Sequence, residues 1–261
     1  MFKEIKVLER IINNKRREVE ERKKKLPLEI LRRRISDLSS RNFKKAISSM
    51  EKINIIAEIK RSSPSAGIIL RDLDPSGVAK TYQENGASAI SVLIDEKFFG
   101  GSLSDLAKVR KATSLPVLAK EFILDEYQIY EAKLLGADAI LLIACILDKR
   151  KLSEFLNLTL RLNLDCVVEI HKEEEIDKVR DLPFDIVGIN NRDLKTFKVD
   201  LRTTFNLIEK IPPGKLVVSE SGIKKREDIR RLREKGVGGF LIGENLLKSK
   251  DIGKKLREFL K

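Results

Sequence analysis

Histidine, cysteine and tryptophan are scarce in this chain of 261 residues, which has one histidine, two cysteines and no tryptophan. The single histidine, His171, argues against a Ser-His-Asp triad. Without an HExxH or CxxC motif, we also expect no metal site. Cys145 and Cys166 lie in apolar runs without metal or redox spacing. We therefore expect both cysteines to be reduced core residues and His171 to have a structural role.

Aromatic residues and long apolar runs are also rare. Aromatic residues make up 5% of the chain, too few for the base-stacking platforms of proteins that bind single-stranded nucleic acids. No run of about 18 apolar residues occurs, and the N-terminus lacks the unbroken apolar stretch of a signal peptide. We expect a cytoplasmic protein that binds neither nucleic acid nor membrane. Because no exposed apolar helix face stands out, we expect a monomer.

Charged residues, in contrast, make up 36% of the chain, and the net charge is +13. Most basic residues alternate with acidic ones, as in segments 15–25 and 224–235, which is typical of solvated helix faces with weak ion pairs. The composition resembles that of thermophile proteins. The positive excess favours an anionic substrate, which it would attract over a long range.

Short apolar runs alternate with segments of helical spacing, several of which end in glycine, and no linker rich in Pro, Gly and Ser divides the chain. The runs predict eight strands, at 53–60, 87–94, 115–122, 137–144, 164–171, 185–192, 215–222 and 238–245. Eight such units favour a (β/α)8 TIM barrel over an open doubly wound sheet. We predict an α/β fold with a single TIM-barrel domain over 1–261. It comprises an N-terminal helical extension (1–50), with helices at 2–25, 28–35 and about 43–50, and eight βα units (53–261).

Polar side chains gather at the ends of these predicted strands. Glu58 and Lys60 lie two positions apart in the first predicted strand, so their side chains are on the same face. Because this fold builds its active site at the carboxyl ends of the strands, the polar or small residues there are candidates: Glu58, Lys60, Lys120, Glu169, Asn190, Glu220, Ser221 and Gly243. Each alone has a structural interpretation, such as a Glu58–Lys60 ion pair on an edge strand or a helix cap. Their recurrence at corresponding strand ends favours a catalytic site.

A phosphate site is predicted after the last two strands, at Ser221-Gly222 and at 243–245. Loops at these positions and the start of a short helix commonly bind phosphate in such barrels, and Ser63 could add a hydroxyl. Segment 236–244 is rich in glycine but does not fit the dinucleotide fingerprint, so we expect no nicotinamide cofactor. Lysine and glutamate remain for proton transfer, because burial and neighbouring charges can tune their pKa values.

Longer segments carry a more specific signal: AEIKRSSPSAG (57–67), SVLIDEKFFGGS (91–102), PVLAKEFILDEYQI (116–129), GADAILLIACIL (136–147), VEIH (168–171), GINNRDL (188–194), SESGI (219–223) and GFLIGENLL (239–247). With them, nearly the whole chain closely resembles the indole-3-glycerol phosphate synthase family of tryptophan biosynthesis. The resemblance implies a lyase without a cofactor. It would close the indole ring of 1-(2-carboxyphenylamino)-1-deoxyribulose 5-phosphate with loss of carbon dioxide and water.

The resemblance also implies residue roles. Lys120 matches the general acid that protonates the substrate ketone, and Glu169 the group that helps remove the hydroxyl as water. Lys60 would hold the carboxylate or share the acid work, so the division between the two lysines stays open. Orienting groups would be Glu58 and Asn190, and Glu220 would complete the polar mouth. Phosphate contacts would come from Ser63, Ser221, Gly222, Gly243 and Glu244, and an apolar wall from Phe99 and Phe122, for which core packing is the alternative.

Some residues depart from those that many family members carry: Ile94, Ala66, Asn245 and Leu247. None of these changes removes a proposed catalytic group. Two other functions stay open. One is phosphoribosylanthranilate isomerase, a barrel that also needs an acid–base pair, although the N-terminal extension and the two lysines argue against it. The other is a basic nucleic-acid or scaffold protein, which would bind polyanions in a salt-sensitive manner.

Overall fold

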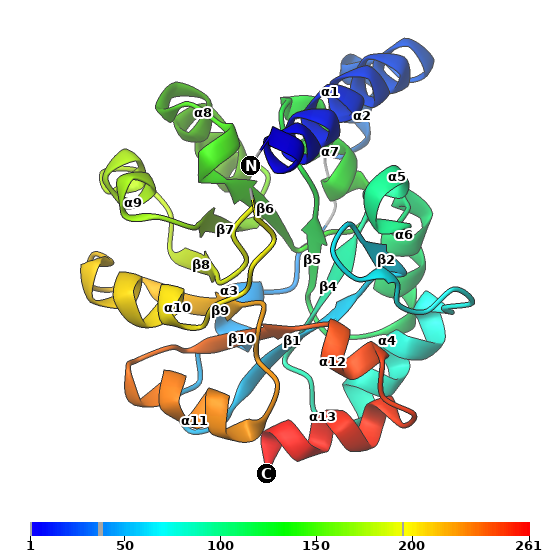
Figure 1. Cartoon of the computed structure of the whole chain (residues 1–261). Helices are drawn as coiled ribbons and strands as arrows, with labels where there is room; N and C mark the ends of the chain where they lie inside the picture. Colours follow the sequence, from blue (N-terminus) through cyan, green and yellow to red (C-terminus); the bar gives the residue numbers. More distant parts are fainter. Residues whose placement is uncertain (1, 36–38, 195) are drawn as a thin grey trace.

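The eight predicted strands form one closed parallel barrel in the computed structural model, which describes residues 2–35, 39–194 and 196–261, with side chains from residue 7 onward (Figure 1). Around the barrel the strands follow the order β1 (Asn54–Ile59), β10 (Gly239–Ile242), β9 (Leu216–Glu220), β8 (Ile186–Asn190), β7 (Asp165–Ile170), β6 (Ala139–Ile143), β5 (Val117–Lys120) and β4 (Ala89–Leu93), and β4 pairs with β1. Each strand lies within its predicted range. The predicted TIM barrel is therefore confirmed.

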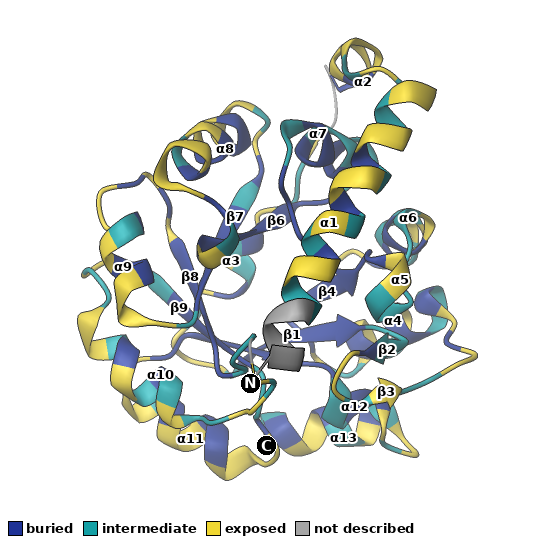
Figure 2. Cartoon of the chain, turned by 45° about the horizontal axis from the view of Figure 1, so that its top comes forward, coloured by how far each residue is buried: buried dark blue, intermediate teal, exposed yellow. Residues whose placement is uncertain are grey.

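Helices cover the outside of the barrel and turn their polar faces to solvent (Figure 2). The longer ones are α4 (Pro75–Glu84), α6 (Leu103–Ala112), α7 (Glu126–Leu134), α8 (Lys149–Arg161), α9 (Glu173–Val179), α10 (Arg202–Leu207), α11 (Arg226–Glu234) and α13 (Ile252–Leu260). Shorter pieces are α5 (Glu96–Phe99), α12 (Glu244–Leu247), η1 (Ala144–Ile146) and η2 (Ile208–Lys210). Several helices start where a side chain accepts a backbone N–H of the first turn, at Asp74, Ser102, Asp125, Asp148 and Asp251.

The interior of the barrel is filled at the amino ends of the strands. Helix α3 (Phe43–Ala46) buries Phe43 and Ile47 completely in the apolar cluster that also holds the inward-facing residue Val218. The backbone N–H of Lys44 donates to Asp165 at the start of β7 (2.9 Å), which fixes α3 there. The predicted third helix, about 43–50, thus ends earlier, at Ala46. Because this end is plugged, the carboxyl ends are left for a cavity.

The first two helices, α1 (Phe2–Lys25) and α2 (Leu28–Arg34), agree with prediction and lie beside α7 (Figures 1 and 2). Val19 of α1 and Leu31 of α2 pack with Tyr127 of α7. Ile11 of α1 instead reaches the cluster inside the barrel, so α1 crosses towards the carboxyl ends of the strands. The predicted ranges 1–50 and 53–261 include Met1, residues 36–38 and Lys195, which lie outside the described residues. The division into these ranges stays a prediction.

The chain after β1 contains strands that were not predicted, and one local expectation, for Cys145, needs correction. The loop after β1 folds into a small hairpin of β2 (Ser62–Ser63) and β3 (Gly67–Ile68). Cys145 is exposed and not a core residue, because β6 ends before it and it lies in the η1 turn. Cys166 in β7 is buried as expected, and both thiols are free. Within the described ranges, none of the helices has the length and apolar character needed to cross a membrane.

Candidate active site

A cavity of about 550 Å³ opens at the carboxyl ends of the barrel strands. Its lining includes every predicted site residue except Glu220: Glu58, Lys60, Ser63, Phe99, Lys120, Phe122, Glu169, Asn190, Ser221, Gly222, Gly243 and Glu244. Glu220 lies behind this lining, fully buried, and accepts a hydrogen bond from Lys120. The structure therefore brings the predicted residues together at one place.

Two lysines and three glutamates form a charged group in this cavity, which we call the mouth cluster: Lys60, Lys120, Glu58, Glu169 and Glu220. Lys120 Nζ binds Glu220 and lies 3.7 Å from Glu169 Oε2 and 3.9 Å from Glu58 Oε2. Lys60 donates to Glu58. The edge-strand interpretation of Glu58 and Lys60 is wrong, because β1 pairs on both sides and Glu58 is only 3% exposed.

The mouth cluster shifts the pKa values of its members. Burial by itself would lower the pKa of Lys120, but the surrounding carboxylates outweigh burial and raise it. Burial raises the pKa of Glu220 to about 7, although Lys120 opposes this. For Glu58, the two lysines overcome burial and lower the pKa. At neutral pH the cluster therefore combines a charged Lys120 with an ionised Glu58, and Glu220 titrates near neutral pH.

His171 touches this cluster from outside the cavity. Its Nε2 atom lies 3.2 Å from Glu169 Oε1, and its side chain is 6% exposed. Burial would raise the pKa of Glu169, but the contact with His171 and the charge of Lys120 lower it to about 2. His171, which we expected to be structural, thus helps to keep Glu169 ionised.

The polar rim of the cavity contains glycines and two neighbouring residues with positive φ angles. Ser221 and Gly222 both have positive φ, 66° and 84°, and a Cβ at Gly222 would lie 2.6 Å from Val199. A Cβ at Gly243 would lie 2.5 Å from Glu58 Oε1, so only glycine fits before α12. Ser63 Oγ accepts the N–H of Ala66 at 3.1 Å and faces the same cavity. Backbone groups can therefore approach a ligand closely here.

Three basic residues of the rim were missed in the sequence: Arg192, Lys224 and Lys248. Arg192 donates to Ser65 at 2.8 Å and lies 3.9 Å from Glu244, which also binds Lys248 at 2.6 Å. Because the Glu244 carboxylate is paired with Lys248 and lies near Arg192, only the backbone N–H of Glu244 is suited to bind a phosphate. Arg192 could have been found, since it follows Asn190 closely after a strand end.

One wall of the cavity is apolar. The rings of Phe99 and Phe122 lie 5.9 Å apart, tilted by 36°, and the predicted pair thus faces the cavity together. Helix α1 adds Leu8 and Ile11, which the sequence analysis did not assign to the site. Their apolar spacing along α1 was visible, but nothing in it showed that the helix reaches the mouth. A flat apolar group fits between this wall and the charged cluster.

A comparison with solved structures agrees with the fold. Thiamine phosphate pyrophosphorylase from Pyrococcus furiosus aligns with 80% of this chain and 95% of its own, with a TM-score of 0.60 and 16% identity. At this identity the likeness concerns the barrel alone.

Sequence comparisons reach further. The family model for indole-3-glycerol phosphate synthase matches residues 8–259. Proteins of that name are 49% identical in Thermoanaerobacter pseudethanolicus, over 98% of this chain and 97% of the relative, and 46% identical in Dehalococcoides mccartyi, over 97% and 100%. The relative from Alkaliphilus metalliredigens is 44% identical, over 97% of each chain. The chain therefore belongs to the indole-3-glycerol phosphate synthase family, carboxy-lyases of tryptophan biosynthesis.

Proposed function

We propose that this protein closes the indole ring of 1-(2-carboxyphenylamino)-1-deoxyribulose 5-phosphate, with loss of carbon dioxide and water, by lysine and glutamate acid–base catalysis. The observation that carries the proposal is the position of Lys120. Its ammonium group faces the cavity and has the carboxylates of Glu58, Glu169 and Glu220 around it. An apolar wall and a basic, glycine-rich rim flank it, which matches a substrate with an aromatic ring and a phosphate.

Ring closure needs an acid at the ketone oxygen. When the aromatic carbon attacks the ketone, negative charge develops on that oxygen, and Lys120 neutralises and protonates it. The raised pKa of Lys120 keeps the ammonium protonated until this charge develops. Lys60, bound to Glu58 at the same wall, holds the substrate carboxylate or shares the acid work.

Loss of carbon dioxide follows ring closure: the bond between the attacking carbon and its carboxyl group breaks, and the electron pair restores the aromatic ring. The later loss of water needs a base as well as an acid. Glu169 is ionised, because its pKa is lowered to about 2, so it can accept a proton from the ring CH2 group beside the nitrogen, while the C–O bond breaks and the hydroxyl takes a proton from a lysine ammonium and leaves as water. Asn190 lines the cavity at the end of β8 and orients these groups. Glu220 holds the Lys120 ammonium from behind.

The remaining contacts position the substrate. We assign its phosphate to Ser63 Oγ, the Ser221-Gly222 turn and the backbone N–H groups after Gly243, with Arg192 and Lys248 close by. Its aromatic ring lies against Phe99 and Phe122. Holding both ends places the ring carbon and the ketone near Lys120, which lowers the entropic part of the barrier.

The test is a continuous assay of indole fluorescence with the purified chain and this substrate. Because the chain has no tryptophan, its own background is low. We expect turnover by the native protein and a loss of about 10²–10⁴-fold in kcat for Lys120→Ala, the usual range for a general acid. Lys224→Ala is the matched control, since it removes an exposed rim lysine without touching the mouth cluster. Turnover by Lys120→Ala at the native rate would refute the acid role, and no turnover by native protein would refute the reaction.

A further inference from the structure

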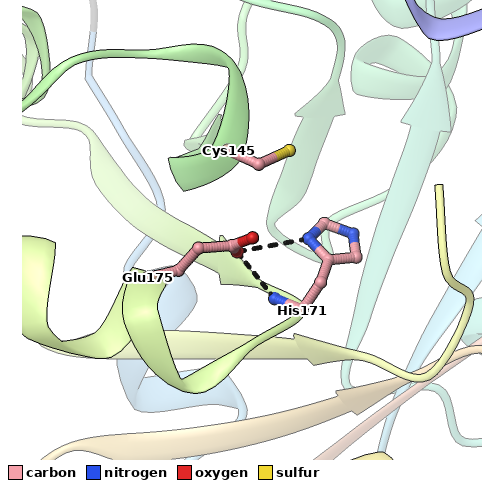
Figure 3. A group of neighbouring side chains, drawn as sticks. All are labelled: Cys145, His171 and Glu175. Atoms are coloured by element: carbon pink, nitrogen blue, oxygen red, sulfur yellow. Dashed lines mark hydrogen bonds and ion pairs between the residues drawn. The ribbon is translucent and has the colours of Figure 1, made fainter. Parts of the chain in front are cut away.

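Three potential metal ligands, Cys145, His171 and Glu175, come together beside the mouth cluster but outside the cavity lining. Strands β6 and β7 pair with Ile143 opposite Glu169, so the residues two positions further on in each chain segment lie close together. Cys145 then sits in η1, His171 directly after β7, and Glu175 in the first turn of α9. Figure 3 shows the three side chains converging from these elements.

The spacing of these donor atoms suits a small tetrahedral ion. The thiol sulfur, a ring nitrogen and a carboxylate oxygen all lie within 4.8 Å of one another, and His171 Nδ1 is 3.4 Å from Glu175 Oε2. In a tetrahedral zinc site with bonds of about 2.0 Å, a nitrogen and an oxygen ligand lie about 3.3 Å apart. The pair is thus already at this separation, and the sulfur, which lies within 4.8 Å of both atoms, has to move closer to share the ion.

The surrounding contacts hold the three residues in place. The backbone N–H of His171 donates to Glu175 Oε2 at 2.8 Å, which fixes the carboxylate beside Nδ1. Lys178 of α9 donates to the carbonyl oxygens of Ala144 (2.7 Å) and Leu147 (3.1 Å), so the turn carrying Cys145 is tied to the same helix. Lys178 therefore directs its charge to carbonyl groups.

The buried imidazole lies between two carboxylates. Among the described residues, Nδ1 of His171 is 3.4 Å from Glu175 Oε2, and neither ring nitrogen has a partner in ideal hydrogen-bond geometry, although both are buried. Nε2 faces Glu169 Oε1 at 3.2 Å. Histidines that bind metal through one nitrogen commonly turn the other towards a carboxylate, which sets the tautomer. Glu169 is placed to do this, and it leaves Nδ1 on the side of Cys145 and Glu175.

We propose that Cys145, His171 Nδ1 and Glu175 bind one Zn²⁺ ion. Sulfur, imidazole and carboxylate ligands together suit zinc, and the exposed side of Cys145 leaves a fourth position for water. The thiol loses its proton when the metal binds. The ligand spacing 145, 171 and 175 matches no short motif, which is why the sequence predicted no metal site. This site meets the mouth cluster at one contact, His171 Nε2 to Glu169 Oε1, and zinc binding can be tested without the ring-closing reaction.

The test uses the full chain, freed of metal and titrated with Zn²⁺ against a coloured zinc chelator. We expect one ion per chain for the native protein, and a loss of affinity of at least about 100-fold for Cys145→Ala, because losing even an outer partner of a metal site costs about 10–100-fold. Cys166→Ala is the matched control, since it removes the other, buried thiol. It should bind zinc like the native protein.

Cobalt supplies an independent readout of the ligands. With Co²⁺, the native protein and Cys166→Ala should show thiolate-to-cobalt charge-transfer absorption in the near ultraviolet, and Cys145→Ala should not. Glu175→Gln should weaken binding but keep this band, since the thiolate remains. Equal zinc affinity of the native protein and Cys145→Ala, or a cobalt spectrum without the thiolate band, would overturn the proposal.

Discussion

Two groups of buried charge lie at the carboxyl ends of the strands and meet at neighbouring residues, Lys120 and Glu121, yet they are built differently. In the mouth cluster the Lys60 and Lys120 side chains are 15% and 13% exposed and line the cavity. The second group, which we call the sealed cluster, consists of Lys15, Glu18, Asp95 and Glu121. There the Lys15 side chain is 1% exposed, with three carboxylates at 2.7–2.9 Å.

Buried ion pairs alone therefore do not mark an active site. The sealed cluster ties α1 to the ends of β4 and β5, because Lys15 belongs to the helix and its two most buried partners follow those strands. The mouth cluster leaves its cations open to a ligand. Both contain a carboxyl group, Glu121 or Glu220, whose pKa is raised to about 7. What differs is access from the cavity to the cation.

The largest effect that tests this contrast is on stability. Lys15→Met leaves Asp95 and Glu121 buried without their cation, and breaking a buried pair in this way costs about 3–5 kcal/mol. We expect the free energy of unfolding, measured by urea denaturation, to fall by that amount. Lys120→Met should cost less, because Lys60 still binds Glu58 and His171 still contacts Glu169. Lys24→Met, on the exposed side of α1, is the control; an equal loss in all three variants would refute the distinction.

The second effect is the pH dependence of that stability. Burial, with the charge of Asp95, raises the pKa of Glu121 from about 4.5 to about 7 although Lys15 opposes it. Between these values the folded chain binds a proton that the unfolded chain has lost, so this group makes stability fall as pH rises from about 4.5 to about 7. The change from this group is at most about 3.4 kcal/mol. Glu121→Gln should remove this contribution in urea titrations from pH 4.5 to 8 and leave that of Glu220, whose pKa is raised to a similar value, whereas Glu18→Gln should keep both.

How far the sequence predicts these features depends on their range along the chain. Strand ends and their polar residues were readable, because period-two alternation and the barrel rule place Glu58, Lys120 and Glu169 at one rim. The sealed cluster was not, since Lys15 looks like any other lysine in a charged helix. Cys145 was misjudged for a related reason: an apolar run does not reveal where the strand ends and a turn begins. The sequence pattern alone did not reveal contacts between elements that lie far apart along the chain.

A smaller effect, the pH dependence of kcat/KM, should distinguish Glu220 from Glu121, whose carboxyl groups have similar pKa values. Ionised Glu220 holds the Lys120 ammonium, so kcat/KM should rise about tenfold from pH 6 to pH 8 as a group with a pKa of about 7 ionises. Glu220→Gln should lose this rise. Glu121→Gln should keep it, because its carboxyl group accepts from Lys15 and the Phe122 N–H and has no contact with Lys120 among the hydrogen bonds of the described side chains. A pH profile of Glu220→Gln that matches the native one would contradict the assignment.

The smallest effect concerns added salt. The proposed substrate carries a carboxylate and a phosphate, and the chain has a net charge of +13, so long-range attraction should assist its capture by the open mouth cluster. Raising the chloride concentration from about 0.01 M to about 0.1 M shortens the screening length from about 30 Å to about 10 Å, and we expect kcat/KM to fall roughly two- to fivefold.

The sealed cluster supplies the internal control for this measurement. Lys15 lies within 3 Å of each of its three carboxylates and its side chain is 1% exposed, so the same salt should leave the stability difference between the native chain and Lys15→Met unchanged within about 0.5 kcal/mol. Chloride is the suitable anion, because sulfate or phosphate would compete for the proposed phosphate site. If kcat/KM stayed flat while that stability difference shrank, the cluster open to ions would be the one at Lys15, and the contrast between the two would be reversed.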